Sequence, residues 1–396
     1  MQMLDLAWRL PAYWASRTLR EGWPRPMPMN LTLSLTYRCN SRCATCNVWR
    51  REAEELTIAE WDQVLRSLGR APYWITVSGG EPLFRRDAAG IIRLACEHCR
   101  PAILNIPTNG LLPERISRSV GEVTAACPNT SVVVNLSLDA WGDDHDRIRG
   151  MTGNFERAME TYRQLRALDA PNLTLGVHTV VSRFNAEAVP ALYTRVQEEL
   201  APDSYVSEIA EERVELGTVG MDIMPDPDVY RETIERVMAM QSCHPPSGLD
   251  RVTWAFRRRY YRLVQQWLQE KNSSHHSNGR GRQVIPCYSG WASAQISPDG
   301  DVWFCCVQAE PVGNLREADY DFKRIWWGER AQALREDVRK GRCNCPLANA
   351  AYTNFLLHPP SLVGVAWDLT RRNDRQWEYW SPERQASAVD TWCAPW

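Results

Sequence analysis

The chain has 396 residues, a formal net charge of −2 and 44% hydrophobic residues. This length allows an extended α/β domain together with a smaller second domain. The near-neutral charge argues against a general nucleic-acid binder, because such proteins usually carry a basic excess. The sequence contains no apolar run of about 18 residues, so it predicts no membrane-spanning helix. Its N-terminus also lacks the pattern of a secretory signal. We therefore expect a cytoplasmic protein that binds no nucleic acid.

Residues 1–27 differ from the rest of the chain, because leucines and tryptophans alternate there with Arg9, Arg17 and Arg20. The pattern predicts a helical extension packed on the main domain. The alternative is a peripheral membrane contact through residues 1–23, since basic residues and tryptophans suit the membrane interface. Pro11 interrupts the pattern and argues against both interpretations.

Residues 28–225 alternate short β-rich runs with longer helical patterns. The predicted strands are 31–36, 73–78, 102–107, 132–138, 173–181 and 204–209. The helical stretches between them include 58–68, 86–98, 155–167 and 187–199. Strands separated by helices predict βαβ units and a parallel sheet, so six units would form a partial (β/α)6 barrel. In such a barrel the chemistry lies at the C-terminal ends of the strands.

The remaining residues divide where the composition changes. Residues 226–282 predict a helical connector that ends in the polar linker KNSSHHSNGRGR. Residues 283–358 predict a small cysteine-bearing module, and residues 359–396 form a Trp-rich tail. His275 and His276 lie in the linker, where a solvated pair is a better interpretation than a metal site.

Three cysteines, Cys39, Cys43 and Cys46, directly follow the first predicted strand with the spacing C-x3-C-x2-C. The chain has 13 cysteines, and an odd, dispersed set fits metal ligation better than a disulfide framework. Three thiolates on one loop can hold three irons of a [4Fe–4S] cluster and leave the fourth iron open. The alternatives are chance clustering or a zinc site with a distant fourth ligand.

This segment resembles the hallmark loop of the radical S-adenosylmethionine (SAM) superfamily. The resemblance implies that SAM chelates the open iron through its amine and carboxylate, and that its reductive cleavage yields a 5′-deoxyadenosyl radical. That radical abstracts hydrogen from an unactivated C–H bond. A reducing partner such as flavodoxin or ferredoxin would supply the electron. Thr45 stands where the family usually has a bulky residue near the adenine, which leaves that contact open.

A second motif, Gly79, Gly80, Glu81 and Pro82, follows the second predicted strand. Glycines let a backbone approach a ligand closely, and a carboxylate accepts hydrogen bonds from an ammonium group. Alone the motif would be a turn, but its position about 35 residues after the cysteines matches the family's GGEP motif. The resemblance implies that it binds the methionine amine. Asn109, in the TNG that ends the third strand, is either another cofactor contact or a turn residue.

The fourth predicted strand carries Ser137 and Asp139, which share one face because they lie two residues apart. With Arg149, they resemble the S-x-D…H-D-x-x-R pattern of the branch that contains sulfatase-maturing and peptide-maturing enzymes. The resemblance implies that Ser137 and Arg149 hold the methionine carboxylate, which suits a guanidinium group. Asp139 is either a ligand contact or a helix cap.

Later strands add candidates for the substrate site. Glu208 and Arg213 lie at the end of the sixth strand and are candidate substrate contacts. His178 lies within the fifth strand, where a core histidine is the preferred interpretation over a catalytic one. Arg183 and Asn185 follow that strand in a loop that we expect to face solvent.

The C-terminal module has its own cysteine pattern. Cys287 and Cys305 flank Gly300 with the spacing C-x12-G-x4-C, and the turn Pro298–Asp301 predicts a hairpin. The pattern resembles the SPASM and twitch extensions, which implies one auxiliary [4Fe–4S] cluster completed by Cys343 and Cys345. Zinc is the alternative metal. The roles of Cys306 and Cys393 stay open.

Three further cysteines, Cys96, Cys99 and Cys127, lie away from these motifs and are interpreted as buried or free thiols. The combined patterns predict a radical SAM enzyme that acts on a small molecule or a lipid. The alternative is a maturase of a ribosomal peptide or protein. Only 38 residues precede Cys39, fewer than a leader-peptide recognition domain needs, and this favours the first interpretation.

Overall fold

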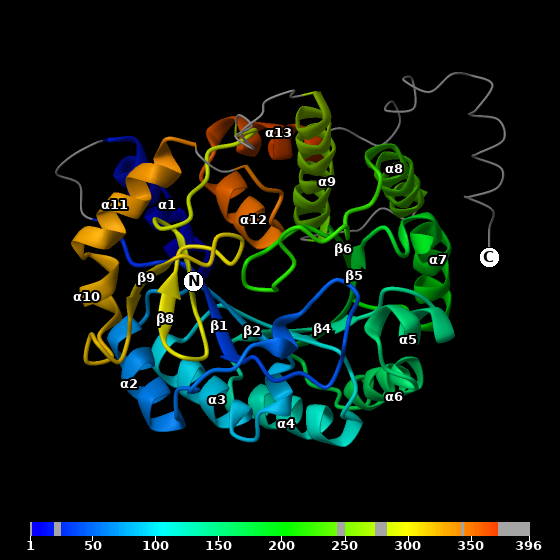
Figure 1. Cartoon of the computed structure of the whole chain (residues 1–396), viewed down its shortest axis with the longest axis horizontal. Coiled ribbons are helices and arrows are strands. Elements are labelled where there is room, and N and C mark those ends of the chain that lie inside the picture. The colour runs from blue at the N-terminus through cyan, green and yellow to red at the C-terminus, as the bar shows by residue number, and fades with distance from the viewer. Residues whose placement is uncertain (1, 20–24, 244–249, 274–282, 342–343, 371–396) are drawn as a thin grey trace.

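The computed structural model describes residues 2–19, 25–243, 250–273, 283–341 and 344–370. Within these ranges, nine strands form one sheet in the order β6-β5-β4-β3-β2-β1-β7-β8-β9. The first six strands curve into a partial barrel with helices on its outer side (Figure 1). Strand β6 is one edge of the sheet, so its pairing does not close the barrel onto β1.

Strands β1 to β6 are parallel to their neighbours, and the predicted partial (β/α)6 barrel is confirmed. The strands are β1 Asn30–Thr36, β2 Trp74–Gly79, β3 Ile103–Thr108, β4 Ser131–Ser137, β5 Leu173–Val181 and β6 Ser204–Ile209. The outer helices are α2 Ile58–Leu68, α3 Ala88–Cys99, α4 Pro113–Ala126, α5 Asp143–Arg149, α6 Asn154–Arg166 and α7 Val189–Glu199.

Alternation along the strands separates the helix-facing core from the inner face of the barrel. On β3 and β4, Leu104 and Val134 belong to the main hydrophobic core and are fully buried. Their neighbours Asn105 and Asn135 point to the opposite face, because successive side chains of a strand alternate. There the Asn135 amide donates to Asn105 Oδ1 at 2.7 Å. The inner face of the barrel is therefore polar.

The C-terminal module continues the barrel sheet. Its first strand, β7 Ser293–Ile296, pairs in parallel with β1, with Asn30 opposite Ser293. The predicted hairpin is present, since β7 and β8 (Asp301–Trp303) are antiparallel and β9 (Pro311–Asn314) extends them. Helices α10 Phe322–Trp326 and α11 Glu329–Arg339 follow. The module is therefore continuous with the barrel sheet through β1.

Four later helices pack around a second core beside β5 and β6. They are α8 Pro227–Cys243, α9 Asp250–Ser273, α12 Ala348–Leu356 and α13 Pro359–Thr370. The core includes Tyr230, Tyr260 and Phe355, which are buried. Lys271 of the predicted linker belongs to α9, whereas the linker histidines and Cys393 lie outside the described residues.

Helix α1, Gln2–Thr18, is present as the sequence predicts, but it packs largely on the C-terminal module, whereas the prediction placed it on the main domain. Its Tyr13 is fully buried, and Arg17 donates to the Cys287 carbonyl at 2.8 Å while lying over the Tyr288 ring. Pro11 does not interrupt the helix, contrary to the expectation. The helix continues past it, and the turns that follow carry Tyr13 and Arg17. Within the described residues, no helix combines the length and apolar character needed to cross a membrane.

Candidate active site

The Cys39–Cys46 loop leaves the C-terminal end of β1. All three cysteine side chains are half-buried. Backbone N–H groups point at two of the sulfur atoms: Ser41 donates to Cys39 Sγ at 3.4 Å and Val48 donates to Cys46 Sγ at 3.5 Å. Burial raises the pKa of Cys39 to about 11 and that of Cys46 to about 12. Since a metal ligand must be a thiolate, metal binding here would release protons.

Two side chains from other strand ends reach the same loop. The Asn109 amide, at the end of β3, lies 3.8 Å from Cys39 Sγ and donates to Asn40 Oδ1 at 2.8 Å. Arg149, in the last turn of α5, donates to Cys43 Sγ at 3.8 Å. The structure therefore brings the predicted residues Asn109 and Arg149 together with the predicted cysteines.

The GGEP turn packs directly against the strand that leads into the cysteine loop. Gly80 N–H donates to the Thr36 carbonyl at 2.7 Å, and Glu81 N–H donates to the Arg38 carbonyl at 3.0 Å. A Cβ at Gly79 or Gly80 would collide with these same carbonyl groups. Gly79 also has a φ of +121°, which side-chain-bearing residues rarely adopt. The glycines therefore allow close backbone packing beside the cysteine loop, and Pro82 begins the short turn that follows.

Glu81 is buried at 1% exposure, and its carboxylate is already hydrogen-bonded. Thr108 Oγ1 donates to Oε1 at 3.0 Å, Leu83 N–H donates to Oε1 at 3.3 Å, and Asn109 N–H donates to Oε2 at 2.8 Å. Burial raises the pKa of Glu81 to about 7, although these bonds oppose the rise. Glu81 therefore fixes the turn that carries Asn109. The predicted contact with a ligand ammonium group stays a prediction.

Asp139 lies beside Arg149, with 2.8 Å between Asp139 Oδ2 and Arg149 Nε. Burial alone would lower the pKa of Arg149, but the nearby Asp139 and Cys43 raise it, and the net change is a rise. Asp139 also accepts a hydrogen bond from Val180 N–H at 2.9 Å. It is therefore an ion-pair partner of Arg149 and does not cap α5, whose N-cap residue is Gly142.

A polar network beneath the cysteine loop was not predicted from the sequence. His145 Nδ1 accepts from Asp139 N–H at 3.2 Å, and its Nε2 lies 3.2 Å from Asn154 Oδ1. Asn154 in turn donates to Ser41 Oγ at 3.4 Å. Burial, followed by the charge of Arg149, lowers the pKa of His145 to about 4, so this histidine is neutral. The S-x-D…H-D pattern contained His145, but no signal in the sequence indicated Asn154.

The inner face beside this site carries a row of polar residues. Ser137 on β4 is directly opposite His178 on β5, and His178 Nε2 lies 3.5 Å from Glu208 Oε1 on β6. Burial alone would raise the pKa of Glu208, but the nearby His178 lowers it, and the net change is a decrease. His178, predicted as a core residue, is therefore an inner-face partner of Glu208. Arg183 lies in a loop, as predicted, and forms an ion pair with Asp222.

The second cysteine set gathers around Cys345. Burial raises the pKa of the Cys345 thiol, and Cys305 and Cys287 lie close enough to raise it further. Cys306 is buried at 7% exposure in an apolar cluster with Leu347. Cys343 lies outside the described residues. Cys287 and Cys305 thus lie within electrostatic range of Cys345, while no three His, Cys, Asp or Glu side chains of the described residues are spaced to hold a metal ion together.

The segment 211–217, which we call the strap, runs between the two cysteine sets. On one side Asn47 N–H donates to the Leu216 carbonyl at 2.8 Å. On the other side Glu215 N–H donates to the Cys306 carbonyl at 3.2 Å. Within the strap, Arg213 pairs with the buried Glu211 at 3.1 Å. The predicted candidate Arg213 thus lies between the two cysteine sites.

Comparison with known protein families decides the assignment. Residues 33–196 match the radical SAM superfamily, and residues 287–346 match the SPASM iron–sulfur cluster-binding domain. The chain belongs to the radical SAM superfamily, in its SPASM-containing branch. The two matches include both cysteine sets.

Curated relatives of this radical SAM enzyme carry diverse names. An Fe-coproporphyrin III synthase of Methanosarcina barkeri is 29% identical over 43% of this chain and 41% of its own length. An AdoMet-dependent heme synthase of the same organism is 27% identical over 80% of this chain and 87% of its own length. A PqqA peptide cyclase of Xanthomonas euvesicatoria is 26% identical over 74% of this chain and 71% of its own length. The match thus spans less than half of the first relative.

Solved radical SAM structures share this fold. SuiB of Streptococcus suis bound to S-adenosylmethionine is 17% identical, with a TM-score of 0.57 over 78% of this chain and 68% of that chain. SuiB bound to its precursor peptide SuiA gives a TM-score of 0.56 at 17% identity, over 84% of this chain and 71% of that chain. At this identity the likeness establishes the fold alone.

The donor set of the first cysteine loop fits an iron–sulfur cluster. Four N–H groups, from Ser41, Val48, Asn109 and Arg149, point at its sulfur atoms. Hydrogen bonds to sulfur are one of the means by which proteins tune such clusters. The family assignment and this donor set support a [4Fe–4S] cluster and SAM as the cofactors of the enzyme.

Proposed function

We propose that the enzyme uses Cys39, Cys43 and Cys46 to hold the SAM-binding cluster and modifies a peptide or protein substrate at an unactivated C–H bond. When bound, the cluster and SAM supply a 5′-deoxyadenosyl radical that abstracts hydrogen. A flavodoxin-like or ferredoxin-like reductant would provide the electron. The observation that carries the peptide assignment is the PqqA peptide cyclase, which matches this chain over 74% of its residues.

This assignment replaces the small-molecule or lipid substrate that the sequence favoured. A tetrapyrrole is the second candidate, because the match to the heme synthase covers 87% of that relative. The charges beside the site do not decide between the two classes. Glu208, Glu211 and Glu215 lie near Arg213, but burial raises the pKa of Glu211 to about 7 and also raises that of Glu215. The peptide assignment is therefore tested by experiment.

The substrate class can be tested by the origin of the abstracted hydrogen. Cells that express the enzyme would be grown in deuterated medium and fractionated into low-mass polypeptides, lipids and tetrapyrroles. Each fraction would be incubated with the reduced enzyme and unlabelled SAM. We expect mass spectrometry to detect deuterium in 5′-deoxyadenosine with the polypeptide fraction. Deuterium transfer from the lipid or tetrapyrrole fraction alone would contradict the proposal.

We propose that Arg149 and Ser137 hold the methionine carboxylate of SAM. The part of the site that receives the methionine amine would be formed by Gly79, Gly80, Glu81 and Asn109. Arg149 is suited to this role because it is held beside Cys43 by its ion pair with Asp139. Asp139 thus acts by positioning Arg149. Glu81 holds the Asn109 turn through three hydrogen bonds.

Replacement of Arg149 by alanine should weaken SAM binding while leaving the iron content unchanged. A charge-assisted hydrogen bond contributes about 1.5–3 kcal/mol, so the Kd should rise roughly tenfold to a hundredfold. The Kd would be measured by titrating SAM while recording the paramagnetic spectrum of the reduced cluster. The control is Arg147→Ala, because Arg147 lies on the same helix but is exposed and pairs with Asp144. Equal affinities in the two variants would show that Arg149 does not hold SAM.

Glu208 and His178 are proposed to face the substrate. Both lie on the inner face next to Ser137, and neither contacts a cysteine sulfur in the described hydrogen-bond network. Glu208→Gln should lower deuterium transfer from the polypeptide fraction by at least about tenfold, since it removes a charged partner from a half-buried pair. Uncoupled formation of 5′-deoxyadenosine should persist. Glu199→Gln, on the exposed surface of α7, is the control, and an equal loss of uncoupled cleavage in Glu208→Gln would contradict this role.

We also propose that Cys287, Cys305, Cys343 and Cys345 hold one auxiliary [4Fe–4S] cluster. Support comes from the proximity of Cys287, Cys305 and Cys345. Cys306 is buried beside Leu347 and Ala350, in a cluster against which Cys345 also packs, and it is not included in the proposed ligand set. The strap would then separate the two clusters and place Arg213 and Glu211 between them.

A further inference from the structure

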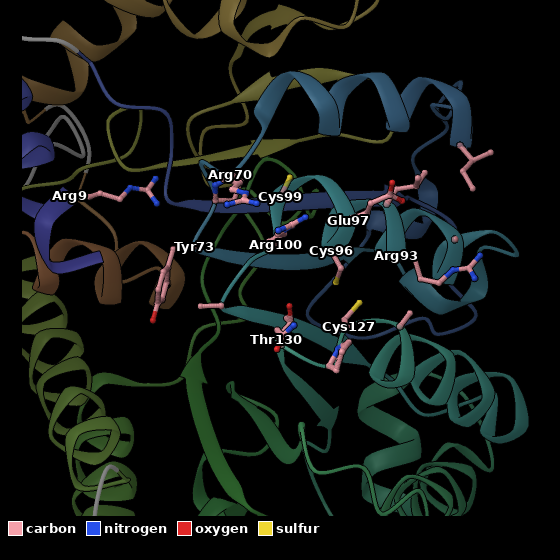
Figure 2. Close-up of a pocket in the computed structure, with 18 residues that line it drawn as sticks. Arg9, Arg70, Tyr73, Arg93, Cys96, Glu97, Cys99, Arg100, Cys127 and Thr130 are labelled. Carbon is pink, nitrogen blue, oxygen red and sulfur yellow. The ribbon is translucent and has the colours of Figure 1, made fainter. Parts of the chain in front are cut away.

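The end of the barrel opposite the active site contains a solvent-open pocket of about 1140 Å³ (Figure 2). It is formed where α2, α3 and α4 end and β2, β3 and β4 begin. Its lining includes three cysteines that the proposed function leaves unused, Cys96, Cys99 and Cys127. A site here would act independently of the substrate chemistry at the other end.

Two of these cysteines form a pair. The sulfur atoms of Cys96, on the last turn of α3, and Cys127, after α4, point toward one another in Figure 2. The two thiols also lie close enough for each to shift the pKa of the other. Cys99 and Cys127 are both buried, at 1% and 4% exposure, but Cys99 instead donates to the Leu65 carbonyl at 3.7 Å. The pocket therefore holds one facing thiol pair and one separate thiol.

The surroundings of the pair favour a thiolate. The neighbouring Cys96 thiol lowers the pKa of Cys127, burial opposes this change, and the charge of Arg93 lowers the pKa further. The pKa of Cys96 is raised, first by Cys127 and then by burial. Cysteines that react with oxidants typically have stabilised thiolates and a second cysteine close by.

The pocket is also rich in positive charge. Four arginines line it, whereas Glu97 is its one acidic lining residue. The arginines are Arg9, Arg70, Arg93 and Arg100. A concave surface of one charge raises the local concentration of ligands of the opposite charge. The pocket therefore favours a reagent that carries carboxylates.

We propose that Cys96 and Cys127 are a thiol–disulfide exchange site for an anionic low-molecular-weight disulfide. A thiolate of the pair attacks one sulfur of the disulfide, forms a mixed disulfide and releases one small thiolate. The second cysteine then loses its proton and attacks the mixed disulfide. The Cys96–Cys127 bond forms and the second small thiolate leaves. Two protein thiols are oxidised, one external disulfide is reduced to two thiols, and the protons pass to solvent or to the released thiolates.

The first test maps the products of exchange on the anaerobic holoenzyme, with glutathione disulfide as the probe. Non-reducing peptide mapping should show a Cys96–Cys127 link in the native chain and in Cys99→Ser, with unchanged iron content. Cys96→Ser should instead accumulate glutathione on Cys127, because the second cysteine is missing. A native chain that stays reduced, or that carries glutathione on Cys99 without the link, would overturn the proposal.

The second test addresses the charge of the pocket by comparing glutathione disulfide with neutral hydroxyethyl disulfide. The Arg93→Ala/Arg100→Ala variant should react about threefold to tenfold more slowly with glutathione disulfide and at the native rate with the neutral reagent. Arg118→Ala, an exposed change on α4 outside the pocket lining, is the control. Equal native rates for both reagents would contradict the proposed anion selectivity.

Discussion

Replacement of Cys39, Cys43 and Cys46 by alanine should abolish the formation of 5′-deoxyadenosine. The reconstituted native chain is expected to hold about eight irons, and the variant should lose about four of them. The physical reason is that three thiolates on one loop hold three irons and leave the fourth for SAM. Iron and sulfide analysis, with chromatography of the SAM cleavage products, measures both effects.

The matched control replaces the three unassigned cysteines of the barrel, Cys96, Cys99 and Cys127. This control should retain the full iron content and the cleavage activity, because its cysteines lie at the opposite end of the strands. Retention of 5′-deoxyadenosine formation in the Cys39/Cys43/Cys46 variant would contradict the assignment of this loop.

Replacement of both Cys287 and Cys305 by alanine should remove a second set of about four irons. Uncoupled SAM cleavage should survive, because neither cysteine belongs to the first cysteine loop. The sulfur atoms of that loop are contacted by Asn109 and Arg149. Substrate modification should be lost. Metal analysis before and after the change distinguishes iron from zinc.

Cys306→Ala is the control for this second cluster. Cys306 adjoins Cys305 in sequence and packs with Leu347 beside Cys345, but it is outside the proposed ligand set, so its loss should leave the iron content unchanged. Loss of the cluster in Cys306→Ala alone would show that the ligand set is wrong. Loss of zinc from the Cys287/Cys305 variant would show that the module binds a different metal.

The sequence located the active-site end of the barrel because the decisive residues are tied to short spacings. Cys39, Cys43 and Cys46 occupy one loop, and the GGEP turn immediately follows β2. Parallel strands bring such loops to one end of a barrel, so Asn109 and Arg149 were also placed correctly beside the cysteines. Strand alternation further predicted which residues share a face.

The supporting contacts could not be predicted, because they join residues that are distant in sequence. Asn154 meets Ser41 across 113 residues, and β7 of the C-terminal module pairs with β1 of the barrel. The strap is similar, since nothing in its local sequence indicated that Glu211 and Glu215 are buried. Whether a charged side chain is buried depends on its partners in the fold. Contacts between residues that are distant in sequence produce no hydrophobic periodicity, so a single sequence does not reveal them.

The role of Glu81 illustrates the same limit. Its motif predicted a contact with the methionine ammonium group, but the fold surrounds its carboxylate with donors from Leu83, Thr108 and Asn109. Local sequence indicated that an acidic residue belongs at this turn. The direction of its oxygens depends on the neighbouring strand β3.

The central claim is that the cluster held by Cys39, Cys43 and Cys46 binds SAM directly. The most direct test uses the Cys287→Ala/Cys305→Ala protein, because its remaining cluster is the proposed SAM-binding one. The reduced protein would be examined by electron paramagnetic resonance before and after addition of SAM carrying nitrogen-15 in its amine. We expect the spectrum to change and to show hyperfine coupling to the labelled nitrogen. An unchanged spectrum with a full cluster would contradict the claim.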